Sequence, residues 1–299
     1  VGSASTTLAG NDTAHYFNTS PPAGTQRRTR IWVIGDSGAC AESADGCTEG
    51  GLVMNQYLNW VSSNGGNPAD LLLILGDNAY TTGTDAQYTT GLFEVFGDVL
   101  RNHVLWPVPG NHEFGASDSP TQSGPYYDAF TLPTAAESGG IASGTEAYYS
   151  FDFANIHFAA LDSHDTSRLA PANPDTNICP GDSGGAMYNW LCNDLAGTSQ
   201  DWIFTFWHHP PYTKGYHDSD AEAQLAEMRE RFNPVIEAYG ADLNLSGHSH
   251  SYERSVLVDG HYGTSDTYDT NIHALNAGDG DPLGSGSYHK PNLGPDPNQ

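Results

Sequence analysis

Short apolar runs alternate with segments of helical periodicity along most of the chain. Residues 31–35 (IWVIG) and 71–75 (LLLIL) are continuously apolar, which predicts strands buried on both faces. Between them, residues 53–61 carry apolar side chains at helical spacing, and Gly65 and Gly66 follow as a stop signal. This order predicts a parallel, right-handed unit of strand, helix and strand.

The alternation continues to about residue 246, with a long interruption in the middle. Residues 114–146 are rich in Gly, Ser, Pro and Thr, so we expect long loops that lie over the strand ends. The proline in 104–108 (VLWPV) favours an end or an edge of a sheet for that strand. The other expected elements are helices at 86–100, 186–196 and about 219–239, the last kinked at Pro234, a hairpin of 147–153 and 156–161, and strands at 202–207 and 242–246.

Length and charge narrow the functional classes. A chain of 299 residues is long enough for one large α/β domain. Its 36 acidic residues against 10 basic ones give a net charge of -26, which repels nucleic acid and anionic membranes, so neither is an expected partner. No apolar run approaches the roughly 20 residues of a membrane helix, so no membrane span is expected. An anionic phosphate ester would bind to this acidic protein only at a local positive charge, which bound metal cations would provide.

The four cysteines indicate the cellular compartment in which the protein is expected. Three pairings are open if all four are oxidised, and proximity along the chain favours Cys40 with Cys47 and Cys179 with Cys192. None forms a CxxC motif, which argues against a zinc or redox site. The alternative is four buried free thiols. Disulfides together with acceptor sequences for N-glycosylation would indicate a secreted or periplasmic protein.

Short polar clusters stand where apolar runs end. In open α/β sheets, ligands bind beyond the carboxyl ends of the strands, so these clusters are expected to converge on one pocket. They offer carboxylate, phenol, amide and imidazole groups, which together suit a hydrolytic site with two metal ions. The clusters are GDSG at Asp36, GDNAY at Asp77, GNHE at Asn111, WHHPPY at His208 and GHSHSYER at His248.

This ordered series resembles the calcineurin-like metallophosphoesterases, and the position of Tyr80 in GDNAY resembles the purple acid phosphatase branch. The resemblance runs from about residue 30 to 255. It implies an α/β fold in which a sandwich of two β-sheets is flanked by helices. The catalytic domain would occupy residues 30–277, after an N-terminal extension over 1–29 and before a Gly- and Pro-rich loop or tail over 278–299. The arginine-bearing second motif of protein Ser/Thr phosphatases is missing, which argues against that activity.

The resemblance also implies a ligand set for two metal ions. It implies Fe(III) at a first site and Fe(II), Zn(II) or Mn(II) at a second. Adjacent residues at a strand end face opposite sides, so only one of His208 and His209 can be a ligand, and the family pattern favours His208. The implied ligands are Asp77 as the bridge, Asp36, Tyr80 and His250 at the first site, and Asn111, His208 and His248 at the second.

Two further histidines are candidates for catalysis. His112 follows Asn111 and is expected to donate a proton to the leaving group or to grip the phosphate. His217 lies in the loop after His208 at a spacing seen for substrate-contacting histidines of the family, and its alternative is a solvated loop residue. Glu113 is expected to orient a neighbouring group.

The implied activity is that of an acid phosphatase, in which two metal ions activate a hydroxide that attacks a small phosphate monoester. Two alternatives stay open. A phosphodiesterase or nucleotidase on the same scaffold would prefer diesters or nucleotides, and a non-catalytic protein would bind metal or phosphate and hydrolyse nothing. The oligomeric state is not predicted.

Overall fold

The computed structural model describes residues 2–3, 6–7, 15–38, 48–171, 178–181, 184–276, 290 and 293–295. Its centre is a pair of β-sheets. The first holds the parallel strands β3 (Ile31–Ile34), β4 (Leu71–Leu75) and β5 (Leu105–Val108). The second holds β6 (Tyr149–Phe153), β7 (Ile156–Ala160), β8 (Trp202–Phe206) and β9 (Leu243–Leu245).

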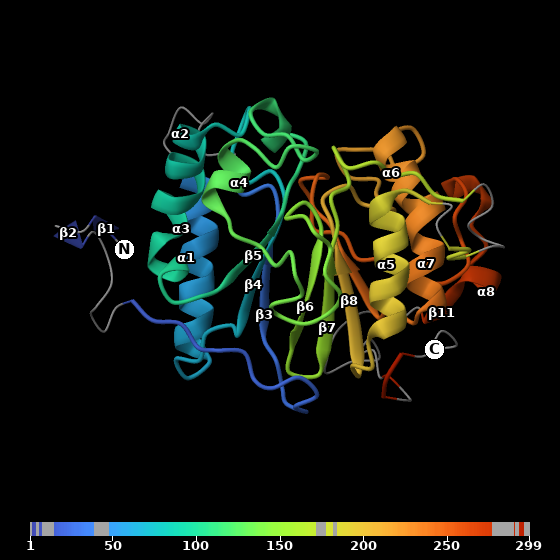
Figure 1. Ribbon diagram of the computed structural model, residues 1–299, viewed down its shortest axis with the longest axis horizontal. Coiled ribbons are helices and arrows are strands. Elements are labelled where there is room, and N and C mark those ends of the chain that lie inside the picture. Colours follow the sequence, from blue (N-terminus) through green and yellow to red (C-terminus); the bar gives the residue numbers. More distant parts are fainter. Residues whose placement is uncertain are drawn as a thin grey trace.

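Helices cover the outer faces of both sheets (Figure 1). On the first sheet lie α1 (Thr48–Ser63), α2 (Asp85–Tyr88) and α3 (Glu94–Leu100). On the second lie α5 (Ala186–Gly197), α6 (Ala223–Glu227) and α7 (Asn233–Ala238). The expected two-sheet sandwich flanked by helices is therefore confirmed.

Aromatic side chains fill the space between the sheets. Trp106 of β5 stacks on Phe151 of β6, with ring centroids 3.7 Å apart, and Phe151 stacks in turn on Phe158 at 4.7 Å. All five residues of β4 are buried, as a continuous apolar run predicts. Burial of this much apolar surface is the main term that holds the two sheets together.

The strand predictions agree with the structure, and two of the helix predictions need correction. The expected helix at 86–100 contains a π-helical segment, Thr89–Phe93, between α2 and α3. The helix expected from about residue 219 begins only at Ala223, and a second π-helical segment, Met228–Phe232, divides it. Pro234 lies in the first turn of α7, directly after this π-helical segment, and the kink expected there stays a prediction.

Residues 114–146 are largely loops, as expected, but they also contain the short helix α4 (Pro125–Ala129). The remaining described elements are the pair β1 (Gly2–Ser3) and β2 (Thr6–Thr7), the pair β10 (Leu257–Val258) and β11 (Ala274–Asn276), the helix α8 (Thr270–His273), and 3₁₀ turns at Glu113–Gly115 and Ser265–Thr267.

The predicted disulfide between Cys179 and Cys192 is present. Cys40 and Cys47 lie outside the described residues, so their pairing stays a prediction. The proposed tail at 278–299 is described only at residues 290 and 293–295, where Lys290 forms a buried ion pair with Asp242 at 2.8 Å. Every helix in the described part of the chain is too short or too polar to cross a membrane.

Candidate metal centre

The predicted ligands come together at the carboxyl ends of the strands. Asp36 follows β3, Asp77 follows β4 and Asn111 follows β5 in the first sheet, while His208 follows β8 and His248 follows β9 in the second. Because both sheets end at the same side of the sandwich, residues that are up to 212 positions apart hydrogen-bond there: the backbone N–H of His248 donates to the Asp36 carboxylate at 2.7 Å.

The donor atoms of the first predicted site surround the Tyr80 hydroxyl. This oxygen lies 3.0 Å from Oδ2 of Asp77 and 3.3 Å from Oδ1 of Asp36. Nε2 of His250 lies 3.0 Å from the same hydroxyl and 3.5 Å from Oδ1 of Asp36. All four side chains that were predicted for this site are therefore neighbours.

The donor atoms of the second predicted site surround Nε2 of His208. This nitrogen lies 3.1 Å from Oδ1 of Asn111 and 3.1 Å from Nδ1 of His248. Oδ2 of Asp77, which also contacts Tyr80, is 3.4 Å away. One carboxylate oxygen thus belongs to both groups, which is the position that a bridging ligand requires.

These spacings fit bound metal ions. Nitrogen and oxygen ligands that lie about 2.0–2.2 Å from one metal are roughly 3 Å from one another, because they occupy neighbouring corners of its coordination polyhedron. Burial and the adjacent carboxylates of Asp36 and Asp77 raise the pKa of Tyr80 above its ordinary value. Crowded carboxylates beside a phenol are stabilised by cations, so the donor set suits two positive ions.

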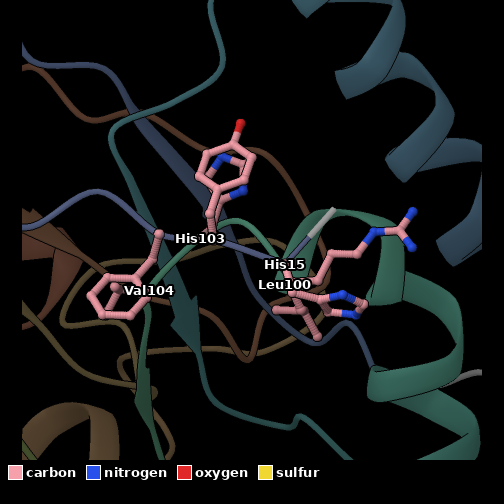
Figure 2. Close-up of a pocket in the computed structure, with 7 residues that line it drawn as sticks. His15, Leu100, His103 and Val104 are labelled. Carbon is pink, nitrogen blue, oxygen red and sulfur yellow. The ribbon is translucent and has the colours of Figure 1, made fainter. Parts of the chain in front are cut away.

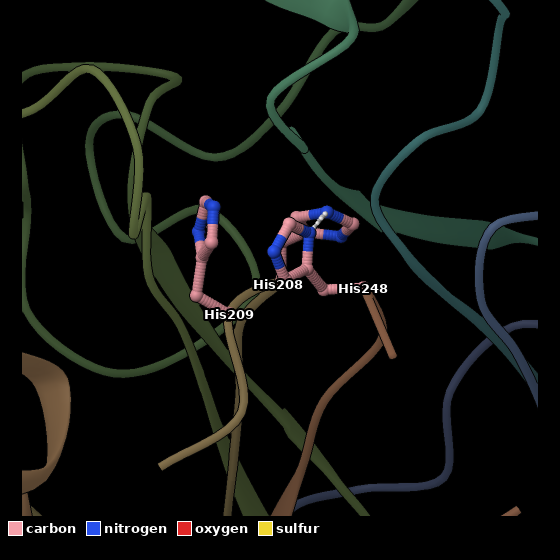
Figure 3. A group of neighbouring side chains, drawn as sticks. All are labelled: His208, His209 and His248. Atoms are coloured by element: carbon pink, nitrogen blue, oxygen red, sulfur yellow. Dashed lines mark hydrogen bonds between the residues drawn. The ribbon is translucent and has the colours of Figure 1, made fainter. Parts of the chain in front are cut away.

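His208 and His209 point in different directions, as Figure 3 shows. Nδ1 of His208 lies 2.7 Å from the carbonyl oxygen of Leu75. That bond places the ring proton on Nδ1 and leaves Nε2 free for a metal. Nδ1 of His209 instead lies 2.8 Å from the hydroxyl of Ser163, and burial, with the neighbouring His208 and His248, lowers the pKa of His209 well below its usual value. Nε2 of His208 therefore lies beside Asn111 and His248, while Nδ1 of His209 is taken up by Ser163, which favours His208 as the ligand.

The backbone is unusual at four of the predicted ligands. The φ angles are 55° at Asp36, 52° at Asp77, 68° at His248 and 50° at His250. Non-glycine residues rarely adopt this left-handed conformation, and where they do the surrounding structure must hold them in it. The left-handed conformation of these four residues is therefore part of the turns that hold their side chains at the strand ends.

Small residues give these ligands room. A β-carbon added at Gly110 would collide with the Asp77 carboxylate, and one added at Gly247 would lie 2.8 Å from Oδ2 of Asp36. Glycine is thus required at these two positions by the close approach of a predicted ligand that follows another strand, β4 or β3.

Glu113 holds the turns after β4 and β5 together. Its fully buried carboxylate accepts hydrogen bonds from the backbone N–H groups of Asp77 at 2.9 Å, Asn78 at 2.7 Å and Gly110 at 2.6 Å. Burial and the charge of Asp77 raise the pKa of Glu113 to about 8, although these hydrogen bonds lower it. Glu113 therefore orients the ligand-bearing loops, in keeping with the role expected for it.

The two candidate catalytic histidines lie on either side of the donor atoms. The ring of His112 packs on that of Tyr80 at 4.3 Å, and its Nε2 is 3.8 Å from Oδ2 of Asp77. The ring of His217 stacks on that of His248 at 3.7 Å. His217 therefore packs against a predicted ligand, and its catalytic role stays a prediction.

Glu222 is a site residue that the sequence did not reveal. It stands immediately before α6, and its carboxylate lies 2.9 Å from Nδ1 of His217 and 3.5 Å from Nε2 of His248. The only signal in the sequence is its position five residues after His217, in a loop that is rich in acidic residues. Histidines and carboxylates in the described residues form close groups of metal-ligand type at His208, His209 and His248, at His217, Glu222 and His248, and at Asp36, Asp77 and His250.

Comparison with known proteins finds similarity to purple acid phosphatases. Over 270 residues the chain is 27% identical to purple acid phosphatase 15 of Arabidopsis thaliana, covering 82% of this chain and 44% of that protein. It is 26% identical to purple acid phosphatase 1 of Ipomoea batatas, covering 81% of this chain and 46% of the relative. The chain thus spans less than half the length of these relatives. A solved purple acid phosphatase from Lupinus luteus seeds aligns with a TM-score of 0.48 and 17% identity, over 78% of this chain and 40% of that one.

The family profile described as "Calcineurin-like phosphoesterase" matches residues 29–252, which include every predicted ligand. The match agrees in extent with the resemblance that the five motifs indicate. The chain therefore belongs to the calcineurin-like phosphoesterase family.

Proposed function

We propose that this protein hydrolyses phosphate monoesters at a dinuclear metal centre. The observation that carries the proposal is the position of Oδ2 of Asp77, 3.0 Å from the Tyr80 hydroxyl and 3.4 Å from Nε2 of His208. A carboxylate oxygen between two groups of donor atoms suits two ions that share a ligand.

Asp36, Tyr80 and His250 would hold the first ion with Asp77, and Asn111, His208 and His248 would hold the second. Phenolate and carboxylate oxygens favour Fe(III) at the first site, whereas imidazole and amide groups favour Fe(II), Zn(II) or Mn(II) at the second. When bound, the two ions supply Lewis acidity, which activates water for attack on phosphorus and offsets charge on the phosphoryl oxygens.

The proton for the leaving alcohol would come from one of two histidines. Nδ1 of His112 lies 2.7 Å from the carbonyl oxygen of Thr81, so it donates there and the Nε2 side of the ring faces the centre. Nδ1 of His217 is bonded to Glu222 at 2.9 Å, which leaves its Nε2 for the substrate. Both rings could donate to the ester oxygen or bind a phosphoryl oxygen.

The cellular setting is also part of the proposal. The disulfide between Cys179 and Cys192 supports a secreted or periplasmic protein, because such bonds persist in oxidising compartments. The small phosphorylated substrate would reach a catalytic domain over residues 30–277, with the extension at 1–29 and the tail at 278–299 outside it.

Metal analysis coupled to hydrolysis assays tests the proposal. We expect two metal ions per chain and faster hydrolysis of 4-nitrophenyl phosphate than of bis(4-nitrophenyl) phosphate, with both activity and metal lost in Asp77→Ala. A preference for the diester or for nucleotides would favour the alternative esterases. Two bound metals without any hydrolysis would favour the binding protein.

A further inference from the structure

An exposed tyrosine stands at the rim of the candidate metal centre. Tyr216 is 82% exposed. Its ring centroid is 6.0 Å from that of His250, with the two planes 23° apart, and 5.2 Å from that of His217, in an edge-to-face contact. The ring therefore touches a ligand of the first site and a candidate proton donor, while most of its surface faces solvent.

The backbone around this ring is fixed. The N–H of Tyr216 donates to the carbonyl oxygen of Ser249 at 3.2 Å, between two predicted metal ligands. The preceding N–H, of Gly215, donates to the hydroxyl of Thr213 at 3.1 Å. A β-carbon at Gly215 would meet the side chains of Ser249 and Ser251, so the loop lies directly on the ligand turn. Exposure of Tyr216 thus comes from a defined loop conformation and not from a dangling segment.

A large ring held in solvent beside a reaction centre is a surface for ligand contact. Aromatic groups stack favourably on tyrosine, and such pairs add to binding beyond the area they bury. His250, on which Tyr216 stacks, has its Nε2 3.0 Å from the Tyr80 hydroxyl, so the ring begins about one side chain away from the first group of donor atoms. A group bonded directly to a phosphate ester oxygen would reach it.

We propose that Tyr216 forms a stacking platform for the leaving group, and that the preferred substrates are aryl phosphate monoesters, whose aromatic ring is bonded to the ester oxygen. This inference rests on the proposed function. In a nucleoside 5′-monophosphate the sugar separates the base from the ester oxygen, which carries the base past the platform. The net charge of -26 also disfavours substrates that bear further phosphates.

Binding of phosphonates to the metal-loaded protein tests the platform without turnover. Benzylphosphonate imitates a phenyl phosphate, and ethylphosphonate is its aliphatic counterpart. By calorimetry we expect the wild-type protein to bind benzylphosphonate about 3- to 10-fold more tightly. Tyr216→Ala should bring the ratio of the two affinities to about one, while Tyr216→Phe should keep the preference.

A tyrosine elsewhere on the surface provides the matched control. Tyr16 is 54% exposed and lines a cavity of about 450 Å³ with Leu100, His103 and Val104 (Figure 2). Val104 immediately precedes β5, so this cavity lies at the opposite end of the strand from Asn111. Tyr16→Ala should retain the wild-type preference.

The outcomes distinguish failure of the stacking platform from failure of the proposed function. If the Tyr216→Ala variant still binds benzylphosphonate more tightly than ethylphosphonate, the stacking platform is excluded, whereas the proposed function is unaffected. If neither phosphonate binds the loaded wild-type protein, the proposed function fails and the platform fails with it. If Tyr216→Ala weakens the binding of adenosine 5′-monophosphate as much as the binding of benzylphosphonate, the ring stacks on nucleobases, and aryl phosphates are not the preferred substrate class.

Discussion

Nδ1 of His217 lies 2.9 Å from both carboxylate oxygens of Glu222. The same carboxylate is 3.5 Å from Nε2 of His248, on which His217 stacks. One acidic side chain therefore positions a candidate proton donor and steadies a predicted metal ligand. Carboxylates that orient histidines in this way commonly contribute 10- to 100-fold to metal affinity or activity, as an order of magnitude.

Removing this carboxylate should reduce activity through His217. We expect Glu222→Ala to lower kcat by about 10- to 100-fold, and to lower it little further in a His217→Ala background. Kinetics of the two single variants and the double variant measure the coupling, and metal content must be determined for each. Glu222→Gln, which keeps an acceptor, should retain more activity. Fully additive losses would show that the two residues act separately.

His112 should matter for turnover more than for metal binding, because its backbone N–H, and not its ring, bonds to Asp77, at 2.9 Å. The ring contacts Tyr80 and faces the donor atoms. We expect His112→Ala to lower kcat by about 10²- to 10⁴-fold, with two metal ions per chain still present. Wild-type turnover in this variant would remove the proposed role.

The Tyr80 hydroxyl reports on the first metal. If it binds Fe(III) as a phenolate, the purified protein should be pink to violet through charge transfer from phenolate to metal, and Tyr80→Phe should remove the absorption band. Visible spectroscopy with metal analysis checks this. A colourless enzyme that is fully active with zinc or manganese would contradict the iron assignment.

A methyl group at Gly110 should disturb the bridge. Because the added β-carbon would collide with the Asp77 carboxylate, we expect Gly110→Ala to weaken metal binding by at least about 10-fold, measured by metal titration. Gly97 in α3 is the matched control, since nothing lies within 4 Å of a β-carbon there. Gly97→Ala should stabilise the protein by about 0.5–1 kcal/mol, with unchanged metal affinity.

A buried histidine away from the centre should make stability depend on pH. His157 on β7 lies 2.8 Å from Asp152 on β6 and 2.9 Å from Asp194 on α5. Burial lowers the pKa of His157, but the hydrogen bonds that its ring donates to these two carboxylates outweigh burial and raise the pKa to about 9 from 6.5. The stabilisation is therefore complete below pH 6.5 and is lost as the pH rises through 9.

Denaturant unfolding at several pH values checks the size and the source of this effect. The full shift corresponds to about 3 kcal/mol. His157→Gln has no ionisable ring, so the difference between wild-type and variant stability should shrink between pH 6.5 and 9. A constant difference over this range would exclude His157 as the titrating group.

The strands and the ligand-bearing turns were predictable because their signals are local. The apolar run LLLIL can be buried only as an interior element, and each polar cluster follows such a run directly. Asp77 and Asn111 could therefore be placed at strand ends before their distance was known. Their common pocket then follows from parallel strands that end at one edge.

The parts that escaped prediction depend on contacts between distant segments. Glu222 has no motif, and it enters the site only because the loop after β8 folds back over His248. His157 received no role from the sequence, yet it joins β7 to β6 through Asp152 and to α5 through Asp194. The two π-helical segments were not predicted either, because each is only five residues long, which is too short for a separate apolar spacing to be recognised.

The left-handed turns at Asp36, Asp77, His248 and His250 lower the stability of the fold in exchange for the positions of their donor atoms. Each conformation costs of order 1–3 kcal/mol for a non-glycine residue, and glycine would relieve that cost while deleting a donor atom. Selection for heat resistance alone would erode the residues that are predicted to hold the cations. Engineering of a hardier variant should therefore leave these four positions untouched and seek its gains in the helices on the outer faces.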